Sequence, residues 1–103
     1  MTQLAFSDGF RSVRIAGHSG YAEAGADIVC AAVSAMASYF CNAAEAFGAK
    51  AEIRAEADEG ILSWKLLSPC PEAERLAEAL YREALELQAQ YPRYVRVIKS
   101  ERE

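Results

Sequence analysis

The sequence contains a single histidine and an odd number of cysteines, three. An odd count argues against a disulfide framework. Cys30 and Cys41 fall in one predicted helix, whose rise separates them by roughly 16 Å, too far for a disulfide or a shared metal ion. A Cys₃His zinc site is the alternative, but this spacing and the lack of any C-x-x-C pair argue against it. We expect no metal and no cofactor.

Long apolar runs, targeting signals and basic clusters are also scarce. No apolar run approaches the roughly 18 residues of a membrane span, so we expect no contact with a membrane. The first ten residues, MTQLAFSDGF, lack the basic-then-apolar order of a signal peptide, and a cytoplasmic location is the default. The net charge is −4 at pH 7, and basic residues gather only near the C-terminus. Direct binding to nucleic acid is therefore not expected, and a basic partner suits the acidic chain better.

What is present is the composition of an ordinary globular protein. The chain has 103 residues, of which 52% are hydrophobic and 25% charged. We therefore expect a single domain over residues 1–103, near the lower size limit for a self-sufficient core.

The apolar pattern predicts seven elements. Alternation predicts strands over 2–7 and 10–17 with a turn at Ser7-Asp8-Gly9, and a hairpin of strands 50–57 and 61–67 around residues 58–60. Helices are predicted from residue 28 to about 47 and from 71 to about 90, followed by a strand near 94–98. The order ββαββαβ predicts an α+β, two-layer fold with a mainly antiparallel sheet and both helices packed on one face.

The first helix has specific predicted ends and faces. Asp27 suits the N-cap position and Gly48 the C-cap, which makes Cys30 the third helical residue. Its predicted apolar stripe consists of Val29, Val33, Met36, Phe40, Ala43 and Phe47, and a second face of small side chains consists of Cys30, Ser34, Ala37 and Cys41. In the second helix Pro71 suits the first position, and the stripe is Leu76, Ala79, Leu80, Ala84 and Leu87.

The stretch from Gly17 to Ser34, GHSGYAEAGADIVCAAVS, holds the only histidine and one cysteine. The thiolate is the reactive form of cysteine, and the first turn of a helix favours negative charge. A neutral imidazole within reach can take the thiol proton and return it to a leaving group. His18 and Cys30 are therefore the candidate pair for acyl transfer, with backbone N–H groups at the helix start as oxyanion donors.

Each candidate also has a structural interpretation. Cys30 could be a small buried hydrophobic residue at the helix start, and His18 a loop residue bonded to backbone. Asp27 could orient His18 instead of capping the helix, although its charge would oppose a thiolate. Ser34, one turn after Cys30, could hydrogen-bond the substrate or the loop, or could serve packing alone.

The loop between His18 and Cys30 carries further candidates. Gly20 and Gly25 could be turn residues or the flexible points of a loop that opens for a peptide. Tyr21 could close over a substrate or shield the loop. Cys41 and Cys70 are predicted to be structural, and Trp64 is predicted to belong to the core.

This stretch resembles the bacterial ribosomal-processing cysteine protease family, whose pattern is close to G-H-A-x-Y-x-x-x-G-x-D-I-V-C-A-x-V-S. The matching positions are Gly17, His18, Tyr21, Gly25, Asp27, Ile28, Val29, Cys30, Ala31, Val33 and Ser34, and Ser19 replaces the usual alanine. The terminal YPRYVRV also looks like the family.

The resemblance implies a Cys30–His18 endopeptidase that removes a short N-terminal extension from a large-subunit ribosomal protein, the twenty-seventh of its series. It also implies a homodimer and a loop that orders around the peptide. Two other functions remain open: a non-catalytic ribosome-assembly or peptide-binding module of the same fold, and a thiol-based redox sensor that uses Cys30.

Overall fold

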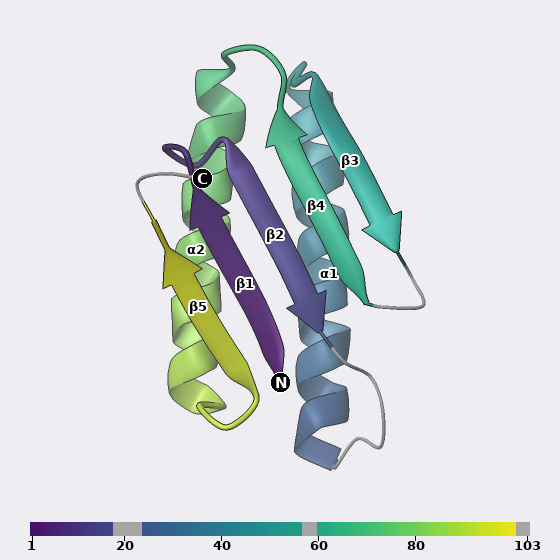
Figure 1. Cartoon of the computed structure of the whole chain (residues 1–103), viewed down its shortest axis with the longest axis vertical. Coiled ribbons are helices and arrows are strands. Elements are labelled where there is room, and N and C mark those ends of the chain that lie inside the picture. The colour runs from purple at the N-terminus through teal and green to yellow at the C-terminus, as the bar shows by residue number, and fades with distance from the viewer. Residues whose placement is uncertain (18–23, 57–59, 101–103) are drawn as a thin grey trace.

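The computed structural model describes residues 1–17, 24–56 and 60–100, without the side chains of 24–27. The elements are β1 (Thr2–Ser7), β2 (Ser12–Gly17), α1 (Ala24–Ala46), β3 (Ala51–Glu56), β4 (Ile61–Leu66), α2 (Pro71–Gln90) and β5 (Val95–Lys99). They form a sheet of order β3-β4-β2-β1-β5, and both helices lie behind the same face of it (Figure 1). The predicted order ββαββαβ and the α+β class are confirmed.

The sheet is mixed, with antiparallel pairs throughout except at one edge. β1 pairs with β2, β2 with β4 and β4 with β3 in antiparallel register, whereas β1 and β5 are parallel. Alternate residues face the helices, so Leu4, Phe6, Val13 and Ile15 are buried. The strand β3 pairs on one side only, and five of its six residues are exposed.

The turn between β1 and β2 is longer than the sequence suggested. Asp8, Gly9 and Phe10 all have positive φ, at 55°, 61° and 64°. The prediction that β2 begins at residue 10 is therefore wrong, because three successive left-handed residues cannot continue a strand. The ring of Phe10 instead packs against Phe6 and Tyr81, at centroid distances of 6.2 and 5.6 Å.

The buried face of α1 differs in part from the predicted stripe. The buried residues are Val29, Val33, Ala37, Phe40 and Ala44. Ala37, predicted on the small-residue face, thus lies in the core, and Phe47 is 59% exposed. Gly48 ends the helix at φ +87°, and the N–H of Ala49 donates to the carbonyl of Ala44. Phe47 therefore lies beyond the last turn and cannot extend the stripe.

The start of α1 contradicts the predicted N-cap. The helix begins at Ala24, so Asp27 lies inside it rather than at the cap position. Alanine is the strongest helix former, and continuing the helix through Gly25 costs only about 1 kcal/mol. Asp27 therefore does not mark the start of the helix. Cys30 is its seventh residue instead of its third.

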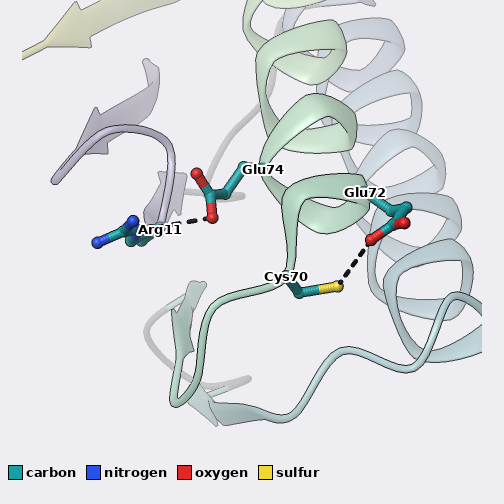
Figure 2. Close-up of polar contacts among 4 residues, drawn as sticks. All are labelled: Arg11, Cys70, Glu72 and Glu74. Atoms are coloured by element: carbon teal, nitrogen blue, oxygen red, sulfur yellow. Dashed lines mark hydrogen bonds and ion pairs between the residues drawn. The ribbon is translucent and has the colours of Figure 1, made fainter.

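The second helix begins as predicted, with Pro71 in its first turn and Cys70 at the N-cap. The Cys70 thiol donates to the Glu72 carboxylate at 3.7 Å, and Arg11 in the β1–β2 turn pairs with Glu74 at 3.5 Å (Figure 2). The buried residues of α2 are Ala73, Ala77, Leu80 and Ala84. Of the rest of the predicted stripe, Leu76 and Leu87 are half-buried, and Ala79 is exposed.

The expectation that no segment is long and apolar enough for a membrane span needs correction. Within α1, the 19 residues Ile28–Ala46 are long and apolar enough, by length and composition, to cross a membrane. Alanine and cysteine raise the hydropathy of this segment without forming an obvious apolar run. In the fold, one side of the same segment packs on the sheet through Val29, Val33 and Phe40, which is how the core helix of a two-layer protein is used.

The contact between α1 and the sheet centres on Phe40 and Trp64, whose rings meet edge to face at 4.7 Å. They are 3% and 2% exposed, so Trp64 is a core residue as predicted.

We predict that Phe40→Ala lowers the free energy of unfolding by about 3–5 kcal/mol, measured by urea denaturation followed by circular dichroism. Phe47→Ala, at the exposed end of the same helix, should change it by about 0.5 kcal/mol or less. Equal losses would contradict this arrangement.

Candidate active site

A cleft of about 400 Å³ lies between α1 and the strands of the β3–β4 hairpin. One wall is a face of α1 that includes Ser34, Ser38, Cys41 and Asn42; the other comes from β3 and β4, including Ala55, Glu56, Gly60 and Ile61, with Ile15 of β2 at the base. The cleft is open enough to admit a polypeptide segment, and most of its lining is apolar or small.

The end of β2 lies at this cleft because of a close contact between two glycines. The N–H of Gly17 donates to the carbonyl of Gly60 at 2.9 Å. Gly60 has φ +66°, and a Cβ on it would overlap the carbonyl oxygen of Gly17. Only glycine allows this approach. β2 therefore ends beside Gly60, which itself lines the cleft.

The helix α1 carries Cys30 and Ser34 to the same region. Cys30 is half-buried and Ser34 is exposed in the cleft. Residues four apart lie on the same helix face, about 5–6 Å from each other. Cys30 therefore lies one turn before Ser34, on the side of the N-terminus of α1. α1 extends past the ends of β2 and β4 towards its own N-terminus (Figure 1). Cys30 thus lies one turn before the α1 wall of the cleft, and Gly17 lies beside Gly60 in the opposite wall.

The expectation that Cys30 lies in the first turn of the helix is wrong. As the seventh residue of α1, Cys30 lies beyond the first turn, where the effect of the helix dipole on a thiolate falls off. Its N–H is also engaged in the helix, because each amide bonds the carbonyl four residues earlier. The expectation that N–H groups at the helix start act as oxyanion donors stays a prediction.

The other two cysteines lie in different surroundings. Burial raises the pKa of the Cys41 thiol, and Cys41 packs against the core and also lines the cleft. Cys70 is buried at the start of α2 and donates to Glu72. None of the three forms a disulfide.

Several predicted site residues lie outside the described part of the chain. His18, Gly20 and Tyr21 belong to residues 18–23, and the side chain of Asp27 is likewise not described. Gly25 lies in the first turn of α1, so it is helical and not part of the connecting loop. The pairing of His18 with Cys30 therefore stays a prediction.

The sequence reasoning missed the cleft walls. Ser38 and Asn42 continue the four-residue spacing of Cys30 and Ser34, and this periodic polar line was the available signal. Gly60 was identified only as a turn residue, because its contact with Gly17 joins residues far apart in sequence. Among the described residues, no group of three or more His, Cys, Asp and Glu side chains could hold a metal ion.

The family described as cysteine protease Prp matches residues 1–96 of the chain. The chain belongs to this family. The fold and the cleft described above are therefore those of a cysteine protease of the Prp family. Among curated proteins, no sequence matches the chain.

Solved structures share the fold of this Prp family member over nearly its whole length. A ribosomal processing protease Prp from Staphylococcus aureus, with a covalently linked product peptide, superposes with a TM-score of 0.84 at 21% identity, covering 97% of this chain and 100% of that one. The same enzyme with a substrate peptide gives 0.84 at 19% identity, covering 96% and 97%. A Streptococcus mutans protein gives 0.80 at 26% identity, covering 98% and 93%.

The raised pKa of Cys41 predicts slow alkylation. At neutral pH a smaller fraction of this thiol is ionised than in an exposed cysteine, so its reaction with iodoacetamide should be slow and should accelerate only as the pH rises further into the alkaline range. Peptide mapping by mass spectrometry from pH 7 to 10 measures this, with the urea-unfolded chain as reference. Equal rates in the folded and unfolded chain would show that the site is not desolvated.

The contact between Gly17 and Gly60 predicts different losses of stability for two alanine variants, Gly60→Ala and Gly9→Ala. Gly60→Ala should lower stability by more than the roughly 1–2 kcal/mol of a left-handed alanine, because its Cβ also displaces Gly17. Gly9→Ala, at φ +61° with no atom within 4 Å, should show only the conformational cost. Thermal and urea unfolding compare the two. If both variants lose the same stability, the close approach does not constrain the end of β2.

Proposed function

We propose that this protein is a cytoplasmic endopeptidase that removes the N-terminal extension of a large-subunit ribosomal protein, the twenty-seventh of its series. The observation that carries the proposal is the open cleft whose wall begins one turn after Cys30. Membership in the cysteine protease Prp family supports the reaction class. The Staphylococcus aureus enzyme of this fold is a ribosomal processing protease and binds substrate and product peptides, which supports the substrate class.

In the proposed mechanism, Cys30 attacks the scissile carbonyl while His18 accepts the thiol proton. The imidazolium then returns this proton to the departing amine, leaving a thioester on Cys30. A water molecule, deprotonated by His18, hydrolyses the thioester and regenerates the thiol. Because the first-turn dipole does not reach Cys30, His18 is the group that we propose to generate the thiolate.

The remaining candidates serve the peptide in this proposal. Ser34 lies in the cleft wall, where its hydroxyl can hydrogen-bond the peptide or the loop. Gly20 and Tyr21 belong to the segment that would order around the bound peptide. We further propose that the protein works as a homodimer, which size-exclusion chromatography with light scattering can test.

The proposed reaction predicts the outcome of incubation with the extended ribosomal protein. The native enzyme should release the N-terminal segment, seen by mass spectrometry. Cys30→Ala should abolish cleavage, and His18→Ala should reduce kcat/KM by roughly 10²–10⁴-fold because it removes the general base and acid. Cys41→Ser should retain most activity, since it changes a cleft thiol but not the nucleophile.

Two results would contradict this function. Normal cleavage by Cys30→Ala would remove the nucleophile assignment, and normal cleavage by His18→Ala would remove the dyad. Tight binding of the extended protein by the native chain without any cleavage would instead favour the non-catalytic assembly module.

A further inference from the structure

The two edges of the sheet differ in whether their outward backbone groups are bonded. At the β5 edge, the N–H of Val95 donates to the carbonyl of Tyr91 at 3.1 Å. The N–H of Val97 donates to Oε1 of Gln88, in α2, at 2.7 Å. At the β3 edge, nothing in the described part of the chain bonds the outer side of the strand. An open edge of this kind is a template for pairing with another strand.

The open backbone groups of β3 belong to Ala51, Ile53 and Ala55. The N–H of Leu67 donates to the carbonyl of Lys50, so these two residues form a hydrogen-bonded pair at the start of the β3–β4 ladder. Such pairs alternate with non-hydrogen-bonded ones along antiparallel strands. Every second residue after Lys50 therefore bonds β4, and the three residues between them direct their N–H and C=O groups away from the sheet.

The side chains of β3 carry an alternating charge pattern on the face of the sheet away from the helices. The residues on this face, all exposed, are Lys50, Glu52, Arg54 and Glu56. Glu52 and Arg54 pair with each other at 3.6 Å, and both side chains remain at least half exposed. On the helix side, Ile53 is 50% exposed. The strand thus offers open backbone groups, an uncovered apolar side chain and charges of both signs.

We propose that β3 is a homodimer interface, in which it pairs antiparallel with β3 of a second copy of this chain. The two-fold axis passes between Ile53 and Ile53 of the second copy, so the two side chains meet on the helix side. Ala51 lies opposite Ala55 of the second copy, and the outward N–H groups of each strand bond carbonyls of the other. This inference rests on the homodimer of the proposed function and supplies its surface, but it does not depend on the proteolytic reaction.

The charges of β3 select this register. With Ile53 opposite itself, Glu52 lies opposite Arg54 of the second copy. Lys50 likewise lies opposite Glu56 of the second copy. Moving the axis by one residue would place Glu52 opposite Glu52, or Arg54 opposite Arg54, and like charges directly opposite destabilise a strand pair. A second copy therefore fits this edge better than an arbitrary peptide, because the strand is complementary to itself in one register.

The pairing also places the second copy beside the cleft. Two strands paired antiparallel about such an axis join their sheets into one and keep both α1 helices on the same side of it. Ala55 lines the cleft and lies opposite Ala51 of the second copy. The second copy therefore extends the wall that β3 and β4 give to each cleft.

Two charge-reversal variants test the interface, with sedimentation equilibrium of the full chain from micromolar to millimolar concentration. Glu52→Arg and Arg54→Glu should each raise the dimer Kd by about ten- to thirtyfold, because the two-fold axis turns one substitution into two like-charge contacts. Mixed in equal amounts, the two variants should form a heterodimer with nearly the native Kd, since each arginine then lies opposite a glutamate. High salt should shrink these differences.

Two further variants locate the effect. Arg96→Glu is the matched control, because it reverses an exposed charge on β5, at the opposite edge, and should keep the native Kd. Ile53→Pro should prevent dimerisation, since it removes an outward N–H that β4 does not bond, and an edge strand tolerates proline at such a position. Thermal unfolding of each variant checks its folding, and rescue by mixing separates loss of the interface from loss of stability.

The outcomes separate the interface from the rest of the proposed function. Restored dimerisation in the mixture would uphold the inference, whether or not the chain cleaves the extended ribosomal protein. A dimer that persists equally in both charge-reversal variants, or one that weakens in both without rescue by mixing, would overturn the inference and leave the homodimer itself. A native chain that is monomeric throughout would overturn both, while cleavage by that monomer would leave the peptidase function.

Discussion

The edge-to-face contact of Phe40 with Trp64 holds α1 against β4, next to the central strand of the sheet. Trp64 comes from β4, so the contact fixes the helix relative to the hairpin that forms the opposite cleft wall. Val29, Val33, Ala37 and Ala44 extend the same buried line along the helix. Because interiors are close-packed, this line leaves α1 little freedom to slide or turn. The orientation of the face with Cys30 and Ser34 is therefore set by core packing, in which Val33 and Ala37 also line the cleft.

A second constraint, the close contact of Gly17 with Gly60, fixes the position of the end of β2 relative to β4. The two constraints together fix Gly17 beside Gly60 and hold α1 across the cleft from them. They do not, however, activate the thiol, because Cys30 lies beyond the helix turn where backbone dipoles act most strongly. In the proposed mechanism the fold supplies position, and the chemistry depends on His18.

The sequence predicted the elements that local chemistry dictates. Alternating residues defined β1 and β4, Pro71 marked the start of α2, and Gly48 marked the end of α1. It failed where local preference was overruled: Asp27 is a good cap, yet helical residues precede it, and Phe10 lies in a turn because its ring packs on Phe6 and Tyr81. The cleft could not be predicted, since Gly60 and Ala55 come to lie across the cleft from α1 only after the sheet has formed.

The most direct test of the account is the alkylation rate of Cys30 at neutral pH, resolved by peptide mapping, in the native chain and in His18→Ala. If the histidine generates the thiolate, the native rate should exceed that of the variant by roughly tenfold or more, while the rates of Cys41 and Cys70 stay the same. Equal Cys30 rates in the two proteins would contradict the claim that the fold brings these two residues into one catalytic unit.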